Sequence, residues 1–127
     1  MDEAPWFHHY EQGVPRSIAD PEITLPEALD QAAARFPDRV ALRFFLDARL
    51  PVPALTYRQL QDETRRFGTA LFQLGVRKGD RVALMLPNCP QFVVAFYGAL
   101  RIGAIPVNTN PLYVSREMRE QFEDSGC

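Results

Sequence analysis

The chain has 127 residues, the length of one ordinary domain, and its 46% apolar and 24% charged residues argue against a disordered protein. Fourteen Lys and Arg against sixteen Asp and Glu give a net charge of −2, so the basic excess of a typical nucleic-acid-binding domain is absent. Two cysteines are too few for a disulfide-stapled secreted fold, which favours a reducing compartment.

Residues 1–23 carry three prolines and no periodicity, so we interpret them as an extended aromatic arm that packs on a domain or on a partner. The arm lacks the apolar core of a signal peptide. Its adjacent His8 and His9 could bind a metal with Asp2 or Glu3, but a surface or packed pair is favoured because adjacent side chains usually diverge. The most apolar stretch, 92–107, is shorter than the roughly 20 apolar residues that cross a bilayer.

A helix over 25–36 is predicted, because Thr24 and Glu27 have the spacing of a capping box and Pro37 ends the pattern. Its expected buried face consists of Leu25, Leu29, Ala32 and Phe36. Two strands follow, 39–46 with one apolar face (Val40, Leu42, Phe44, Leu46) and 55–56 at a sheet edge. Together they form a loose hairpin with an unusually long connection, 46–53.

A second helix, 57–74, is predicted from the capping box of Thr56 and Gln59 and from the left-handed position that Gly75 supplies. Its expected buried face consists of Leu60, Phe67, Leu71 and Leu74. A buried parallel strand over 81–86 and a third helix over 91–102, capped by Asn88, come next. A second buried strand over 104–108 and a fourth helix, from Ser115 to about Gly126, complete the pattern.

The order strand, helix, strand, helix from Arg81 onward indicates a right-handed parallel crossover. Its expected core consists of Val82, Leu84, Leu86, Val94, Phe96, Leu100, Ile105 and Val107. The fold class is therefore α/β, a partial three-layer parallel or mixed sheet with flanking helices. Because a further strand should follow the last helix, the alternation suggests a fragment: an arm, 1–23, and a truncated α/β subdomain, 24–127.

Few residues point to catalysis. The three serines lie outside any G-x-S-x-G sequence, and neither glycine-rich nucleotide fingerprint is present. Cys89 opens a helix, where a thiol pKa is lowered, but a small residue in a buried turn is the favoured interpretation. Arg77 and Lys78, between Gly75 and Gly79, could grip a phosphate, although a helix stop with solvated charges is favoured.

The best binding candidates from geometry are Asn108, Thr109 and Asn110, because open α/β sheets bind ligands beyond the carboxyl ends of their strands. A purely structural Asx-type turn is nevertheless the favoured interpretation of these residues. A receiver-type signalling domain is excluded, since Leu86 and Asn108 are followed by Pro87 and Thr109 rather than by acidic residues. We assign no catalytic, cofactor-binding or metal-binding residue.

Several segments resemble the acyl-adenylate-forming enzymes. Residues 55–60 (LTYRQL) resemble the first core motif of that superfamily, and residues 100–108 (LRIGAIPVN) resemble the second. Between and after them lie 78–83, 86–91, 110–113 and 116–117, in matching order. The Asn-Pro-Leu-Tyr segment, the Pro-Trp arm and residues 35–38 (RFPD) look like the bacterial long-chain fatty-acyl-CoA synthetase branch.

The resemblance implies the N-terminal subdomain of a cytoplasmic ligase, with peripheral membrane association as an alternative for the whole enzyme. Such enzymes use a fatty acid, ATP with magnesium, and coenzyme A, and they form acyl-CoA through an acyl-adenylate. Their phosphate loop, nucleotide-binding segment and catalytic lysine come after both motifs, so this chain is expected to be inactive alone and to hold no cofactor. An exposed cut edge should make it self-associate. The alternative is a stand-alone interaction or structural module derived from that fold.

Overall fold

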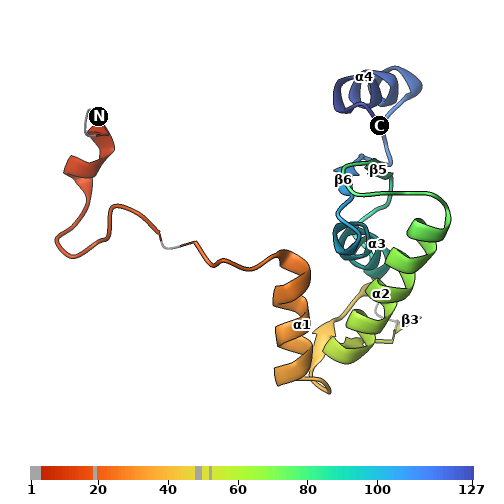
Figure 1. Cartoon of the computed structure of the whole chain (residues 1–127), viewed down its shortest axis with the longest axis horizontal. Coiled ribbons are helices and arrows are strands. Elements are labelled where there is room, and N and C mark those ends of the chain that lie inside the picture. Colours follow the sequence, from red (N-terminus) through yellow and green to blue (C-terminus); the bar gives the residue numbers. More distant parts are fainter. Residues whose placement is uncertain (1–3, 19, 48–49, 52) are drawn as a thin grey trace.

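The order of helices and strands follows the predicted pattern (Figure 1). The structure, a computed structural model, describes residues 4–18, 20–47, 50–51 and 53–127. The helical elements are a 3₁₀ helix η1 (Pro5–His9), α1 (Leu25–Arg35), α2 (Tyr57–Gln73), α3 (Pro90–Arg101) and α4 (Ser115–Ser125). The strands are β1 (Val40–Leu42), β2 (Phe45–Asp47), β3 (Leu50–Pro51), β4 (Leu55–Thr56), β5 (Arg81–Leu84) and β6 (Ile105–Asn108).

The two predicted capping boxes are confirmed. Thr24 Oγ1 accepts the Glu27 N–H at 3.3 Å, and the Thr24 N–H donates to Glu27 Oε2 at 2.7 Å. At the start of α2, the reciprocal bonds between Thr56 and Gln59 measure 3.2 and 2.9 Å. Each box satisfies donors that the first turn of a helix leaves unpaired, so both helices begin where the sequence places them.

The predicted buried faces of these helices need two corrections. In α1 the buried residues are Leu29 and Ala33, whereas Leu25 is 53% exposed. The assignment of Leu25 to the buried face is wrong. The central turns of α1, which contain Leu29 and Ala33, pack against the neighbouring helices, and the first turn does not. In α2, Leu60 is buried as expected, but Leu74, which follows the last helical residue, Gln73, is 81% exposed and does not belong to the buried face.

Close packing of α2 on α3 forms the centre of the molecule. Thr64 is fully buried, and Gly68 and Gly98 let the two backbones approach. A Cβ on Gly98 would lie 2.8 Å from Phe67 Cδ1 and 3.1 Å from the Thr64 carbonyl oxygen, both closer than ordinary contact. The position therefore requires glycine for steric reasons.

The antiparallel hairpin is confirmed, since β1 pairs with β4 through Val40↔Thr56 and Leu42↔Leu55. A second antiparallel pair, β2 with β3, extends it and occupies much of the long connection; residues 48, 49 and 52 of that connection lie outside the described residues. For the strand predicted over 39–46, we expected one buried apolar face that includes Val40. This expectation is wrong at Val40, whose side chain is 48% exposed, because the pairing register shifts between Val40 and Leu42.

The parallel crossover is also confirmed. β5 and β6 are parallel in register from Arg81↔Ile105 to Leu84↔Asn108, and α3 connects them. The helix begins at Pro90 with Cys89 as its N-cap, so the prediction of Asn88 as the cap is wrong. Proline is well suited to the first helical position because its missing N–H and fixed φ cost nothing there, and it starts the helix one residue early.

The predicted core around this crossover is partly correct. Leu84 is 4% exposed, and Ala95, Ala99 and Ala104 are buried beside it. Ile105 is 49% exposed, which corrects its assignment to the core. The sheet that contains it has two strands among the described residues, so the outer side of β6 has no neighbouring strand there. The remaining predicted core residues are half-buried: Val82, Leu86, Val94, Phe96, Leu100 and Val107.

The α/β class is confirmed, with the described strands distributed over three two-stranded sheets. The N-terminal arm extends away from the helices in Figure 1, and η1 buries no residue. Its aromatic rings contact one another, with Trp6–Phe7 and Phe7–Tyr10 centroids 6.2 and 5.5 Å apart. Packing of the arm on a partner therefore stays a prediction. No helix in the described part of the chain has the length and apolar character that crossing a membrane requires.

Candidate functional site at the carboxyl ends of the parallel strands

The carboxyl ends of β5 and β6 border a crevice of about 560 Å³. The loop after β5 contributes Pro87 and Asn88. Of the three residues singled out from the sequence, Asn108 is the last residue of β6, and Thr109 and Asn110 lie in the loop that follows. Its lining residues are Leu86, Pro87, Asn88, Phe92, Asn108, Thr109, Asn110, Pro111 and Leu112. The structure thus brings Asn108, Thr109 and Asn110 together at the edge where α/β sheets bind ligands.

Two of these three side chains are used to hold the loop. Thr109 is 3% exposed, and its hydroxyl donates to the Val107 carbonyl at 3.3 Å. Asn110 Oδ1 accepts the Leu112 N–H at 3.0 Å, which is the Asx-type turn favoured from the sequence. The Asn108 side chain is exposed, while its carbonyl accepts the Gln121 side-chain N–H at 2.9 Å and so ties α4 to β6.

The crevice has the chemistry of a binding surface. Its lining holds amides, prolines and apolar side chains, and none of the lining residues is ionisable. Amides can donate and accept hydrogen bonds, but they supply neither a general base nor a nucleophile at neutral pH. We therefore find no catalytic group among the residues that line it.

The turn between α2 and β5 is held by its own hydrogen bonds. The Arg77 guanidinium donates to the carbonyls of Phe72 at 2.7 Å and Val76 at 2.9 Å, and it lies over the Phe72 ring at 4.0 Å. The Arg77 N–H donates to Asp80 Oδ2 at 2.7 Å. Because these contacts engage Arg77 locally, the helix-stop interpretation describes this turn better than a phosphate grip.

A charged cluster between α1, α2 and α3 was not foreseen from the sequence. The Arg101 guanidinium donates to Asp30 through two bonds of 3.0 and 2.6 Å, and its Nε donates to Thr64 Oγ1 at 2.8 Å. Gln61 and Arg65 also approach Asp30, at 2.7 and 3.7 Å. The hydrogen bonds from Arg101 lower the pKa of Asp30 to about 2.

This cluster joins residues 71 positions apart, so no local motif could reveal the pair. One signal was available: Arg101 is the single charged residue in the otherwise apolar segment 90–101. A lone charge on a buried helix usually has a partner, and here that partner lies on another helix. We interpret the cluster as structural, because it joins three helices and none of its residues lines the crevice.

Other candidates remain isolated. Cys89 and Cys127 are free thiols, and Cys89 makes no side-chain cap hydrogen bond. His8 and His9 lie in η1, while Asp2 and Glu3 lie outside the described residues. Over residues 4–18, 20–47, 50–51 and 53–127, no group of three or more His, Cys, Asp or Glu could hold a metal ion.

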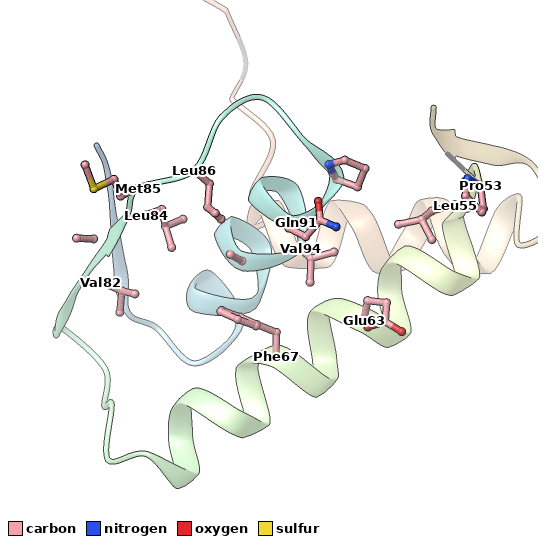
Figure 2. Close-up of a pocket in the computed structure, with 13 residues that line it drawn as sticks. Pro53, Leu55, Glu63, Phe67, Val82, Leu84, Met85, Leu86, Gln91 and Val94 are labelled. Atoms are coloured by element: carbon pink, nitrogen blue, oxygen red, sulfur yellow. The ribbon is translucent and has the colours of Figure 1, made fainter. Parts of the chain in front are cut away.

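A larger apolar groove of about 640 Å³ runs along β5 (Figure 2). In Figure 2, Val82, Leu84 and Leu86 point toward Phe67 and Val94, whereas Met85 points the other way. Leu55 and Pro53, at the hairpin, close one end. Glu63 is the one charged residue in its lining, so this groove suits apolar groups.

Comparison with known proteins assigns this arrangement to a known class. A family model described as AMP-binding enzyme matches residues 29–127. The long-chain-fatty-acid–CoA ligase of Salmonella typhimurium is 43% identical over 124 residues, which cover 96% of this chain and 21% of the relative. The ligase of the same name from Bacillus subtilis is 39% identical over 125 residues, covering 98% and 21%.

A solved structure agrees with these relatives. The N-terminal subdomain of Klebsiella oxytoca NpsA, in complex with anthranilyl-AMSN, superposes with a TM-score of 0.74 at 29% identity. The match covers 81% of this chain and 26% of the NpsA chain. The chain spans about a fifth of the length of the curated relatives it matches.

Proposed function

This chain belongs to the AMP-binding enzyme family, and from that premise we propose that it forms the N-terminal part of a long-chain fatty acid–CoA ligase. The observation that carries the proposal is the 43% and 39% identity to two such ligases over nearly the whole chain. The comparison with NpsA supports the same placement, because the superposed part is an N-terminal subdomain.

The proposed reaction has two steps. A carboxylate oxygen of the fatty acid attacks the α-phosphorus of ATP, which is bound with magnesium, and pyrophosphate leaves to give an acyl-adenylate. The sulfur of coenzyme A then attacks the acyl carbon, and AMP leaves to give acyl-CoA. Catalysis of the first step needs groups that neutralise phosphate charge and align the attacking oxygen.

The described residues do not fit those groups. They offer no cluster for magnesium, and Arg77 is engaged by carbonyl oxygens of its own turn. We therefore derive no step through ATP or magnesium in this chain, and we propose that other parts of the ligase bind both. The role we propose for this part is support, since the Asp30–Arg101 pair and the α2–α3 contact fix the helices behind β5 and β6.

The proposal extends to location and assembly. We place the ligase in the cytoplasm, which the two unpaired cysteines support. We also propose that residues 1–23 act as an arm beside a subdomain of residues 24–127, and that the isolated chain self-associates. Exposed apolar residues in the arm and after β6 support that assembly, among them Trp6, Leu112 and Val114.

A chimera tests the proposed function. This chain replaces the matched fifth of the Bacillus subtilis ligase, and acyl-CoA formation is followed with ATP, magnesium, coenzyme A and a long-chain fatty acid. We expect a rate within about tenfold of the parent enzyme, because support residues affect the chemistry only through position. The corresponding segment of the Haemophilus influenzae relative, 36% identical to this chain, serves as the matched control.

The chimera also separates the two interpretations of the chain. A folded chimera that forms no acyl-CoA, beside an active control chimera, would contradict the ligase proposal. That result would favour a stand-alone structural or interaction module.

A further inference from the structure

Of the four α-helices, α4 is the one that the rest of the described chain covers least. In Figure 1, α4 stands at one end of the molecule, beyond β5 and β6. Among the described residues, no other helix or strand packs broadly against it. Two local contacts hold it: the Gln121 side chain donates to the Asn108 carbonyl at 2.9 Å, and the Arg81 guanidinium lies beside Gly126. One long side of this helix is therefore available to another molecule.

A hollow of about 590 Å³ runs along that side, and its lining consists of residues of α4 and the two residues that follow it. Within it, Met118 and Phe122 lie one turn apart and are half-buried. Val114, four positions before Met118, continues this apolar stripe and is 63% exposed. We call the side of the helix that carries Met118, Arg119, Phe122 and Glu123 the open face of α4.

The open face carries one cation and one anion, a single helical turn apart. Arg119 and Glu123 both line the hollow, and both are exposed. Neither has an ion-pair partner among the residues that the structure describes, whereas Arg116, outside the hollow, pairs with Glu120 at 2.9 Å. A surface that complements the open face must therefore carry an apolar centre with the same two charges in the reverse order.

A second copy of the chain supplies that reversed order. When two α4 helices lie antiparallel about a twofold axis midway between Arg119 and Glu123, Arg119 of each copy faces Glu123 of the other. Each residue advances a helix by about 1.5 Å, so the two Phe122 side chains lie only about 3 Å apart along the helix direction and meet at the centre. A parallel pair would place like charges opposite each other. The charge pattern thus selects both the partner and its direction.

We propose that the open face of α4 is the interface of a homodimer in which the two α4 helices pack antiparallel. The proposal rests on the self-association proposed above and names its surface, and it does not depend on ligase activity. One short helix from each copy makes a small interface beside the roughly 1,600 Å² of a standard one. We therefore expect a dissociation constant of about 100 μM, which corresponds to a weak interface.

Charge reversal tests this pairing with exposed residues, whose exchange leaves the core intact. The full chain is prepared as Arg119→Glu, as Glu123→Arg and as the double variant, and circular dichroism confirms that each is folded. Sedimentation equilibrium is measured from about 10 to 500 μM, with a reducing agent that keeps Cys127 a free thiol. Arg116→Glu and Glu120→Arg are the matched controls, because they change the net charge equally on the same helix but outside the hollow.

We expect each single reversal at the open face to weaken dimerisation by about tenfold or more, because two attractive contacts become two repulsive ones. An equimolar mixture of the two single variants should recover the dimer, since a mixed pair again opposes an acid to a base at both contacts. The double variant should dimerise like the unmodified chain for the same reason. Both controls should also associate like the unmodified chain.

Three results would overturn the proposal. If Arg119→Glu associates as strongly as the unmodified chain, self-association stands but uses another surface. If the mixture associates as weakly as its two components, the antiparallel pairing is wrong. If the unmodified chain stays monomeric up to several hundred micromolar, both this interface and the proposed self-association fail, while the chimera still tests the ligase proposal independently.

Discussion

Replacing Asp30 should show how much the charged cluster between α1, α2 and α3 contributes to the stability of the chain. We predict that Asp30→Asn destabilises the chain by about 1–3 kcal/mol at neutral pH, because Arg101, only 13% exposed in its side chain, loses its charged acceptor. The matched control is Asp38→Asn, which removes an exposed pair with Arg58 at 3.4 Å and should cost less than about 0.5 kcal/mol. Urea unfolding measures both.

The lowered pKa of Asp30 predicts that the stability of the chain depends on pH. Its folded pKa of about 2 lies below the usual unfolded value near 3.9, so its contribution is complete above about pH 4 and is lost as the pH falls toward 2. The free energy of unfolding of the unmodified chain should therefore approach that of Asp30→Asn between about pH 4 and pH 2. A difference between the two that stays constant over this range would contradict the assignment.

Gly98 should not tolerate a methyl group. Replacing a helical glycine by alanine normally gains up to about 1 kcal/mol, but the new Cβ would meet Phe67 Cδ1 at 2.8 Å and the Thr64 carbonyl at 3.1 Å. We expect the clash, about 1–3 kcal/mol, to exceed the gain, so Gly98→Ala is destabilising. Thermal unfolding checks this against Thr69→Ala, on the exposed side of α2. A higher melting temperature for Gly98→Ala would show that α2 and α3 are not in close contact.

At the scale of elements, β5 is the strand that the core depends on. Leu84→Ala should reduce the free energy of unfolding by about 2–5 kcal/mol, the usual cost for a buried leucine. Ile105→Ala on β6 is the control, and its 49% exposure predicts a loss below about 1 kcal/mol. A loss below about 0.5 kcal/mol for Leu84→Ala would mean that this strand is misplaced.

The elements that could be predicted from the sequence are those with local causes. The reciprocal bonds of Thr24 with Glu27 and of Thr56 with Gln59 span three residues, and both fixed a helix start correctly. The parallel strands could be predicted from an apolar run between turn residues. Asn108, Thr109 and Asn110 were correctly placed at the strand ends, since that position follows from the crossover alone.

The predictions that failed concern features that depend on contacts between segments distant in the sequence. The buried face of α1 includes Ala33 because of where α2 and α3 contact it, and no periodicity within α1 distinguishes Ala33 from Ala32. Ile105 is as apolar as Val107, but it lies beside Arg81 on the sheet face where Arg81 is exposed too, so no segment covers this end of the face. For the Asp30–Arg101 pair, the lone charge of Arg101 signals that a partner exists, but neither helical pattern identifies Asp30 as that partner.

At the scale of the whole molecule, the exposed apolar surface predicts self-association. Trp6 and Tyr10 in the arm, and Ile105, Leu112 and Val114 around β6 and its loop, are between 43% and 85% exposed. We expect the sedimenting mass of the isolated chain to rise with concentration, through an interface that includes residues 104–122 or 5–15. A net charge of −2 offers little repulsion against this. A monomer at several hundred micromolar, roughly the range of weak interfaces, would contradict the prediction.

The central proposal is that this chain, as the N-terminal part of a ligase, supports a site whose nucleotide-binding groups lie elsewhere. Calorimetric titration with ATP and magnesium tests it most directly, on the isolated chain and on the chimera with the Bacillus subtilis ligase. We predict no measurable binding to the isolated chain and binding in roughly the micromolar range to the chimera. Micromolar binding of ATP to the isolated chain would contradict the claim, because the described residues would then hold a nucleotide site of their own.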